Sequence, residues 1–217
     1  MNSLDVLEKM LAEMAIRADR QKLKKLLRLR DELLKWNRKI NLTSISCPIE
    51  ILEKHLVDSL TVMPFIHPDS RLLDMGSGGG FPCIPLKIML PALKVCSVDA
   101  VGKKIAFQKH VIRLLQLREF DARHARVEDL AHEQEKFSYD VIVTRAFASL
   151  PEILTLAEPL LSPRGQVIAM KGAEGIREWE DSKNQQGVKH RFECRKQETL
   201  NLPHSKARRV LLFFSKK

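Results

Sequence analysis

Apolar residues recur at helical spacing through the first 63 residues of the chain. The first run holds Leu4, Leu7, Met10, Leu11 and Met14. The second run holds Leu23, Leu26, Leu27, Leu33, Leu34 and Ile40. Residues three or four positions apart share one face of a helix, so each run predicts an amphipathic helix. A third helix is expected from Pro48 to Met63, because proline suits a first helical turn. Residues 1–63 are therefore predicted to form a helical extension.

From residue 64 to residue 217 the pattern changes to short apolar runs that alternate with helical stretches. The expected strands are Arg71–Met75, Lys94–Asp99, Phe120–His124, Tyr139–Thr144 and Gly165–Lys171. The expected helices between them are Pro82–Leu90, Gly102–Gln116 and Leu150–Leu160. This alternation predicts right-handed crossovers and a parallel sheet that is covered on both faces.

Two last strands are expected without a helix between them, at Val188–Arg195 and Arg208–Phe214. Consecutive strands of this kind predict an antiparallel hairpin at the edge of the sheet. The sequence thus predicts an α/β, Rossmann-like fold with a mostly parallel seven-stranded sheet. Residues 64–217 are expected to form one compact unit.

A glycine-rich segment follows the first predicted strand, with Asp74 before it and glycines at positions 76, 78, 79 and 80. Glycine lets the backbone turn tightly and lets a ligand approach where a Cβ atom would clash. Backbone amides at the start of the next helix would face a polar ligand. Asp99 ends the second predicted strand, where a carboxylate can accept both hydroxyls of a ribose. The segment therefore predicts a nucleoside-binding loop.

Two kinds of ligand fit such a loop. The dinucleotide pattern G-x-G-x-x-G would need a glycine at position 81, where this chain has Phe81. The pattern from Gly76 to Gly80, with Asp74 before it, instead resembles the first motif of Rossmann-like methyltransferases. S-adenosylmethionine carries an ammonium group and no pyrophosphate, so an acidic residue beside the loop suits it. The loop favours this methyl donor over a nicotinamide cofactor, although an oxidoreductase remains the rival enzyme.

Further candidates stand at the carboxyl ends of the later strands, where ligands bind in open α/β sheets. Glu128 follows the third strand, in the loop that lies beside an adenine in this architecture. Arg145 ends the fourth strand and is expected to point into the cleft, and Lys171 is a similar candidate at the end of the fifth. His55 and Asp58 lie three residues apart on the third helix, where a helix-surface pair is the expected interpretation.

The motifs that the chain lacks limit the reaction. No Asn or Asp followed by Pro-Pro and an aromatic residue comes after the fourth strand, which disfavours methylation of an exocyclic amine. No cysteine follows the fourth or fifth strand to serve as the nucleophile for cytosine C5. Cys83, in an earlier loop, is expected to pack as a small apolar residue. Methylation of a guanine N7 needs neither this motif nor a cysteine, because the N7 lone pair is free at neutral pH. Positioning alone can supply much of the rate.

Charge and composition indicate a polyanionic partner. The formal net charge is +10, and residues 20–39 contain nine Lys or Arg residues against Asp31 and Glu32. Residues 183–217 contain ten against Glu193 and Glu198. Two basic ends favour nucleic acid. No apolar run reaches the ~20 residues that cross a bilayer, so no membrane is expected. The N-terminal residues do not resemble a signal peptide, and the four cysteines are widely spaced, so a cytoplasmic protein without a metal site is expected.

Four blocks of the chain resemble the small-subunit ribosomal RNA methyltransferase G family (RsmG, also called GidB). They are Trp36–Thr43, His55–Leu60, Leu73–Pro82 and Thr144–Leu150. The resemblance implies methylation of N7 of one guanine, guanine 527 in the standard numbering, in the 530 loop of 16S rRNA. It implies S-adenosylmethionine as donor and the small ribosomal subunit as partner, and we expect a monomer.

The resemblance also implies the donor contacts. They fall at the positions of Gly76, Phe81, Val127, Glu128 and Arg145, while Asp99 would fit the ribose. Gly78 belongs to the same loop, and Arg145 is the expected catalytic residue.

The chain departs from the family pattern at two positions. It has Cys83 where glycine is usual and Ala100 where serine is usual, and these changes bear on donor affinity more than on activity. The alternatives are a methyltransferase for another RNA or a small molecule, and a ribosome-binding module without catalysis.

Overall fold

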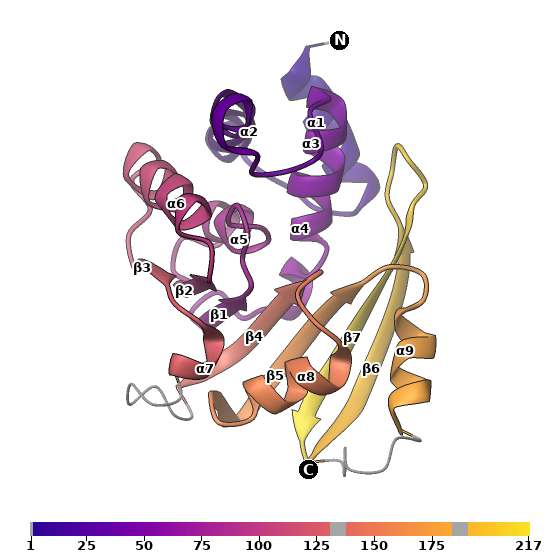
Figure 1. The fold of residues 1–217 in the computed structure, drawn as a ribbon. Coiled ribbons are helices and arrows are strands. Elements are labelled where there is room, and N and C mark those ends of the chain that lie inside the picture. The colour runs from indigo at the N-terminus through magenta and orange to yellow at the C-terminus, as the bar shows by residue number, and fades with distance from the viewer. Residues whose placement is uncertain (1, 131–137, 184–190) are drawn as a thin grey trace.

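The computed structural model describes residues 2–130, 138–183 and 191–217. Its centre is a seven-stranded sheet in the order β3-β2-β1-β4-β5-β7-β6, with helices on both faces (Figure 1). The five parallel strands are β1 (Arg71–Met75), β2 (Lys94–Asp99), β3 (Phe120–His124), β4 (Tyr139–Arg145) and β5 (Leu161–Lys171). The predicted fold class is confirmed.

The last two strands form the antiparallel hairpin that the sequence predicts. Strand β7 (Arg208–Lys216) pairs with β5, and β6 (Phe192–Asn201) pairs with β7 at the outer edge. The prediction placed β6 too early, at 188–195, and residues 188–190 lie outside the described part of the chain. Strand β6 is exposed or half-buried at all but its first residue, so it lacks the apolar pattern that would mark its true bounds.

Two hydrophobic clusters fill the two faces of the sheet. One face is covered by α5 (Cys83–Met89) and α6 (Gly102–Leu114), together with the N-terminal helices α1 (Ser3–Glu13), α2 (Arg20–Ile40), α3 (Pro48–Ile51) and α4 (Asp58–Leu60). Leu26, Phe107, Val143 and Phe213 meet in this cluster, so the N-terminal helices share a core with the sheet. The other face carries α7 (Val127–Leu130), α8 (Leu150–Ala157) and α9 (Gly175–Lys183). The sequence interpretation did not include α7 or α9.

The third predicted helix is not uniform. Helix α3 passes into a π-helical turn at Leu52–Val57, and α4 follows it. A π-turn widens the backbone ring by one residue and is common at functional sites. This one carries Glu53, Lys54 and His55 toward the carboxyl ends of the strands. Within the described ranges, no helix has the length and apolar character that crossing a membrane requires.

Candidate functional site

The glycine loop after β1 contains three residues with left-handed backbone angles. The φ angles are +68° at Gly76, +57° at Gly78 and +87° at Gly80. A Cβ atom would lie 2.2 Å from the ring of Phe147 at Gly76 and 2.3 Å from Ile84 at Gly80, but would meet nothing within 4 Å at Gly78. Packing therefore requires the first and third of these glycines, while the middle one faces open space.

A buried polar network fixes the shape of this loop. The Gln108 amide donates to Ser77 Oγ (2.8 Å) and to the carbonyl oxygen of Gly78 (2.7 Å). The Gly78 amide in turn donates to Asp99 Oδ2 over 2.8 Å. The second oxygen of Asp99 accepts a hydrogen bond from the amide of Val101, also over 2.8 Å. The glycine loop and the carboxylate that ends β2 are therefore held in one fixed arrangement.

Asp74 lies beneath the loop and is fully buried. Its Oδ2 atom accepts a hydrogen bond from the amide of Cys83 over 3.1 Å, and its Oδ1 atom has no hydrogen-bond partner among the described residues. Burial raises the pKa of Asp74 to about 6. Burial also raises the pKa of the Cys83 thiol well above its ordinary value, and the neighbouring Asp74 adds to this rise. Cys83 is fully buried, as a packed apolar residue would be.

Arg145 connects the end of β4 to the π-helical turn. Its Nη1 atom donates to the carbonyl oxygen of Lys54 (2.8 Å) and to Asp58 Oδ2 (3.4 Å). Its Nη2 atom lies 3.2 Å from His55 Nδ1. Asp58 also accepts a hydrogen bond from Arg209 Nε on β7 at 3.1 Å. A single buried carboxylate thus joins two arginines from different strands.

The surface pair that the sequence suggested at His55 and Asp58 is wrong. Asp58 is only 3% exposed, and the ring of His55 stacks on Phe81 with centroids 4.8 Å apart. Burial lowers the pKa of His55 to about 3, and the charges of Arg145 and Lys54 add to this effect. The ring is therefore neutral at pH 7. Because Nδ1 accepts from Arg145, Nε2 carries the proton and donates to Thr43 Oγ1 at 2.9 Å.

Sequence reasoning missed this cluster because its partners are far apart along the chain. The bond from Arg145 to Asp58 spans 87 residues, and the bond from Arg209 to Asp58 spans 151. No local pattern reports such pairs. Arg209 in particular was seen only as part of a basic C-terminal segment.

Two cavities flank the glycine loop. The first measures about 430 Å³ and lies between the loop, the segment after α2 and the ends of β4, β5 and β7. Its polar lining includes Thr43, Lys54, His55, Asp58, Arg145, Lys171 and Arg209. The second measures about 420 Å³ and is lined by Asp99, Val127, Glu128 and Phe147 among others. Both cavities include Gly76, Lys104 and Ala146, so they adjoin at the loop.

The structure therefore brings the predicted site residues together. Gly76, Gly78, Phe81 and Arg145 line the first cavity, while Asp99, Val127 and Glu128 line the second. Asp74 lies in neither lining and supports the loop from below. Lys171 lines the first cavity, where its ammonium group contacts Glu178 at 3.0 Å. Among the described residues, no group of three or more His, Cys, Asp or Glu side chains could hold a metal ion.

Comparison with known proteins gives consistent matches. The family model "GidB: rRNA small subunit methyltransferase G" matches residues 22–210. The chain is 44% identical over 211 residues to a ribosomal RNA small subunit methyltransferase G of Syntrophotalea carbinolica, covering 97% of each protein. It is 53% identical over 148 residues to the protein of the same description in Geobacter sulfurreducens, covering 68% of each.

Solved structures of the same fold are more distant in sequence. A structure of a fibrillarin/Nop5p complex superimposes with a TM-score of 0.57 at 17% identity, covering 75% of this chain and 84% of the other. A structure of M. jannaschii TYW2 in complex with AdoMet gives a TM-score of 0.55 at 16% identity, covering 75% of this chain and 76% of the other. At these identities the likeness establishes the fold alone.

Proposed function

Because the chain belongs to the rRNA small subunit methyltransferase G family, we propose that it methylates N7 of guanine 527 (standard numbering) in the 530 loop of 16S rRNA. The proposed donor is S-adenosylmethionine. The observation that carries the proposal is the pair of adjoining cavities on either side of one rigid glycine loop.

The second cavity has the features that an adenosine requires. Asp99 stands at the end of β2, where its carboxylate can accept ribose hydroxyls in addition to its two backbone amides. Val127 is apolar and offers a packing surface for the adenine, and Glu128 offers an acceptor for its amino group. Ala100 lines the same cavity and has no hydroxyl to offer, which supports an effect on donor affinity.

The loop itself suits the methionine part of the donor. The open space at Gly78 lets a ligand lie against the backbone. The Oδ1 atom of Asp74 has no partner among the described residues, and its charge can attract an ammonium group nearby. Such a cation would lower the pKa of Asp74, which burial has raised. The methyl group would then be directed toward the first cavity, where the target base is proposed to bind.

The first cavity suits a guanine. Guanine presents its N7 and O6 acceptors on one edge, and arginine is the side chain that most often recognises them. Arg145 uses three of its five N–H groups in the bonds to Lys54, Asp58 and His55 within the described structure, which leaves two for a ligand. We propose that these two donors bind O6, which leaves the N7 lone pair free to attack the methyl group, and that they so orient N7. Arg145 is then the catalytic residue in the sense that it touches the base.

The reaction needs no general base from the protein. The donor supplies a methyl carbon on a sulfonium, which the N7 lone pair takes as the C–S bond breaks and its electrons return to sulfur. No proton leaves the base, so the task of the protein is alignment. His55 stays neutral here and fixes Arg145, while its Nε2 proton fixes Thr43 on the opposite wall.

Methyl transfer from labelled S-adenosylmethionine to 16S rRNA from cells that lack this enzyme tests the proposal. We expect label at N7 of the one guanine in the 530 loop, located by cleavage at the modified base. Label at another position, or in another RNA only, would contradict it.

The role of Arg145 has its own test. We expect Arg145→Ala to lower kcat by roughly 10²-fold or more, as loss of alignment does, and to weaken binding of S-adenosylhomocysteine much less, because Arg145 is one of several expected donor contacts. Arg145→Lys should lose nearly as much, because lysine cannot reproduce the three-way contact to Lys54, Asp58 and His55. Circular dichroism verifies the fold of both variants. Full methyl transfer by a folded Arg145→Ala protein would remove Arg145 from the mechanism.

We also propose a monomeric, cytoplasmic protein in which residues 1–63 extend a methyltransferase unit of residues 64–217. Light scattering measures the mass of the particle in solution. A dimer at assay concentrations would contradict the first part of this proposal.

A further inference from the structure

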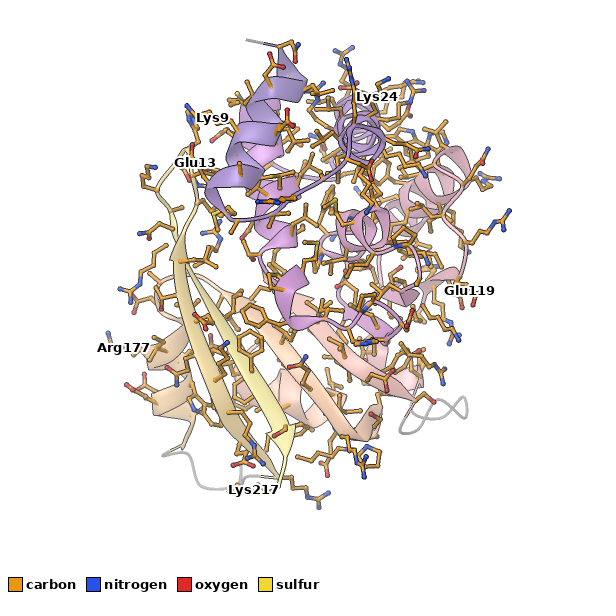
Figure 2. All side chains as sticks on the ribbon, turned by 180° about the vertical axis from the view of Figure 1, so that it is seen from behind. Lys9, Glu13, Lys24, Glu119, Arg177 and Lys217 are labelled. Atoms are coloured by element: carbon orange, nitrogen blue, oxygen red, sulfur yellow. The ribbon has the colours of Figure 1, made fainter. Side chains whose placement is uncertain are left out.

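Many of the exposed cations of the N-terminal half lie on two helices. The exposed Lys and Arg side chains of α2 and α6 that have no ion-pair partner in the described structure are Arg20, Lys24, Lys35, Arg38, Lys39, Lys103, Lys109 and Arg113. We call these eight residues the basic ridge. Lys24, Lys35 and Arg38 recur at helical spacing, so they lie on one face of α2. Figure 2 shows Lys24 extending outward from this helix.

The two helices of the basic ridge are fixed against each other. Trp36 of α2 packs edge-on against Phe107 of α6, with ring centroids 5.6 Å apart. Glu32 of α2 is 3% exposed and lies 2.9 Å from His110 of α6 and 3.1 Å from Arg28. These contacts make one rigid surface of the two helices, which lie side by side in Figure 1.

The outer strand of the C-terminal hairpin is different, because carboxylates pair with the cations there. Arg195 pairs with Glu193, and Lys196 pairs with Glu198 at 2.9 Å. Arg191 pairs with Glu158, the residue that follows α8, at 2.5 Å. The sequence counts the two basic ends of the chain alike, but β6 and its start present paired cations, while the exposed Lys206, Arg208 and Lys217 are the cations of the C-terminal segment that have no ion pair in the described part of the chain.

The basic ridge leads directly to the first cavity. Leu33 of α2 and Lys104 of α6 both line that cavity, and the four residues Leu42–Ile45 that follow α2 form part of its wall. From Lys24 to Arg38 the helix extends about 21 Å at 1.5 Å per residue. The positive surface is thus long enough to follow several nucleotides and ends where the target base is proposed to enter.

The composition of the surface favours a polyanion over a membrane or a protein partner. Among the described residues, the large hydrophobic side chains that are exposed are Val101 and Leu114, at 37% and 39%. Protein interfaces and membrane-binding helices need more apolar surface than these two residues supply. A row of unpaired Lys and Arg residues matches a phosphate backbone.

We infer that the basic ridge binds the rRNA backbone that flanks the target guanine, and that the paired cations Arg191, Arg195 and Lys196 of the C-terminal hairpin do not. The identity of the RNA rests on the proposed function. Contacts of this kind position the RNA without reading its sequence. Base selection would remain with the first cavity.

Two charge-matched triple variants test this inference. The ridge variant carries Lys24→Gln, Lys35→Gln and Arg38→Gln. The hairpin variant carries Arg191→Gln, Arg195→Gln and Lys196→Gln. Each lowers the net charge by three, and the hairpin variant also leaves three carboxylates without their partners, so RNA near the hairpin would be repelled.

Affinity for 16S rRNA is measured without donor over a range of salt concentrations. We expect the ridge variant to bind about 10-fold or more weakly, with a log–log salt slope smaller by about 2–3, since each lost phosphate contact removes roughly 0.7–0.9. The hairpin variant should bind within about two-fold of the unaltered protein. Equal losses, or a larger loss for the hairpin variant, would overturn the inference.

Turnover separates this inference from the proposed function. The ridge variant should raise KM for rRNA and leave kcat and the affinity for S-adenosylhomocysteine unchanged. A fall in kcat with unchanged KM would also contradict the inference that the basic ridge binds rRNA. If the unaltered protein binds rRNA through the ridge but methylates another position, the proposed function fails while the ridge stands.

Discussion

Gly78 and Gly80 share a left-handed backbone but differ in what surrounds them. Alanine at either position bears about 1–2 kcal/mol of backbone strain. At Gly80 the added Cβ atom would also meet Ile84 at 2.3 Å, whereas at Gly78 it would enter open space. Substitutions at the two positions therefore test the stability of the fold and the binding of the donor separately.

We expect Gly80→Ala to lower the free energy of unfolding by about 3 kcal/mol or more, from strain and overpacking together. Gly78→Ala should lower it by only about 1–2 kcal/mol and weaken binding of S-adenosylhomocysteine at least tenfold. Urea denaturation and calorimetry measure the two effects. Unchanged ligand binding by Gly78→Ala would show that the donor does not lie against this residue.

His55 makes stability depend on pH. Its pKa is about 3 in the folded protein, against about 6.5 when exposed, so the unfolded chain takes up a proton that the folded protein refuses. Its contribution is fully present above pH 6.5 and is lost as the pH falls toward 3. One pKa unit corresponds to about 1.4 kcal/mol, so the loss at pH 5 is about 2 kcal/mol.

We expect His55→Gln to remove this dependence, because glutamine can accept from Arg145 and donate to Thr43 without titrating. Between pH 7 and pH 5, the unaltered protein should lose about 2 kcal/mol of unfolding free energy relative to the His55→Gln variant. Urea denaturation at both pH values measures it. A constant difference would mean that His55 is not held neutral by its surroundings.

At the scale of elements, the π-helical turn holds the hairpin as well as Arg145. Glu53 is fully buried, and its Oε1 atom accepts hydrogen bonds from the amides of His204 and of Ser205, the latter at 2.8 Å. These amides lie in the turn between β6 and β7. The contact ties the N-terminal helices to the far edge of the sheet.

We expect Glu53→Ala to lower the free energy of unfolding by about 2–4 kcal/mol, because two amides lose a charged acceptor. Glu53→Gln keeps an acceptor oxygen and should lose less. Hydrogen exchange at Ser205 should accelerate in the alanine variant. Unchanged protection at Ser205 would show that the turn between β6 and β7 is stable without Glu53.

The sequence was informative where the element is buried and regular. Strands β1 and β2 were predicted with the bounds that the structure has, because their buried apolar runs end at turn residues. The bounds of β3 also match, although one residue of β3 is buried. Helix α9 was missed because the strand before it was expected to lead directly to the hairpin. The loop of Gly76 was found because its φ angles demand glycine, whereas the cluster around Asp58 depends on pairs that only the folded chain creates.

At the scale of the whole molecule, the net charge of +10 overstates the surface that is available to a polyanion. Several of the cations are consumed by ion pairs such as Arg191–Glu158 and by buried contacts such as Arg145–Asp58. The distribution of charge after folding, and not its sum, sets the response to salt.

For the unaltered protein we expect rRNA affinity to fall with salt at a log–log slope of about −3 to −5. This corresponds to roughly five phosphates at about 0.7–0.9 each. All nineteen cations of the two basic segments acting together would give a slope several times steeper. Filter binding between 50 and 300 mM salt measures it, and a flat response would exclude backbone binding altogether.

The bridge from Asp58 to Arg145 and Arg209 has a consequence for how the protein is made. Translation delivers Asp58 first, Arg145 much later and Arg209 only with β7, the strand that lies between β5 and β6. A nascent chain from which β7 has not yet emerged has an incomplete wall around the first cavity. Its Asp58 carboxylate still lacks Arg209. We therefore expect the first cavity to be completed late in synthesis, when β7 joins the sheet.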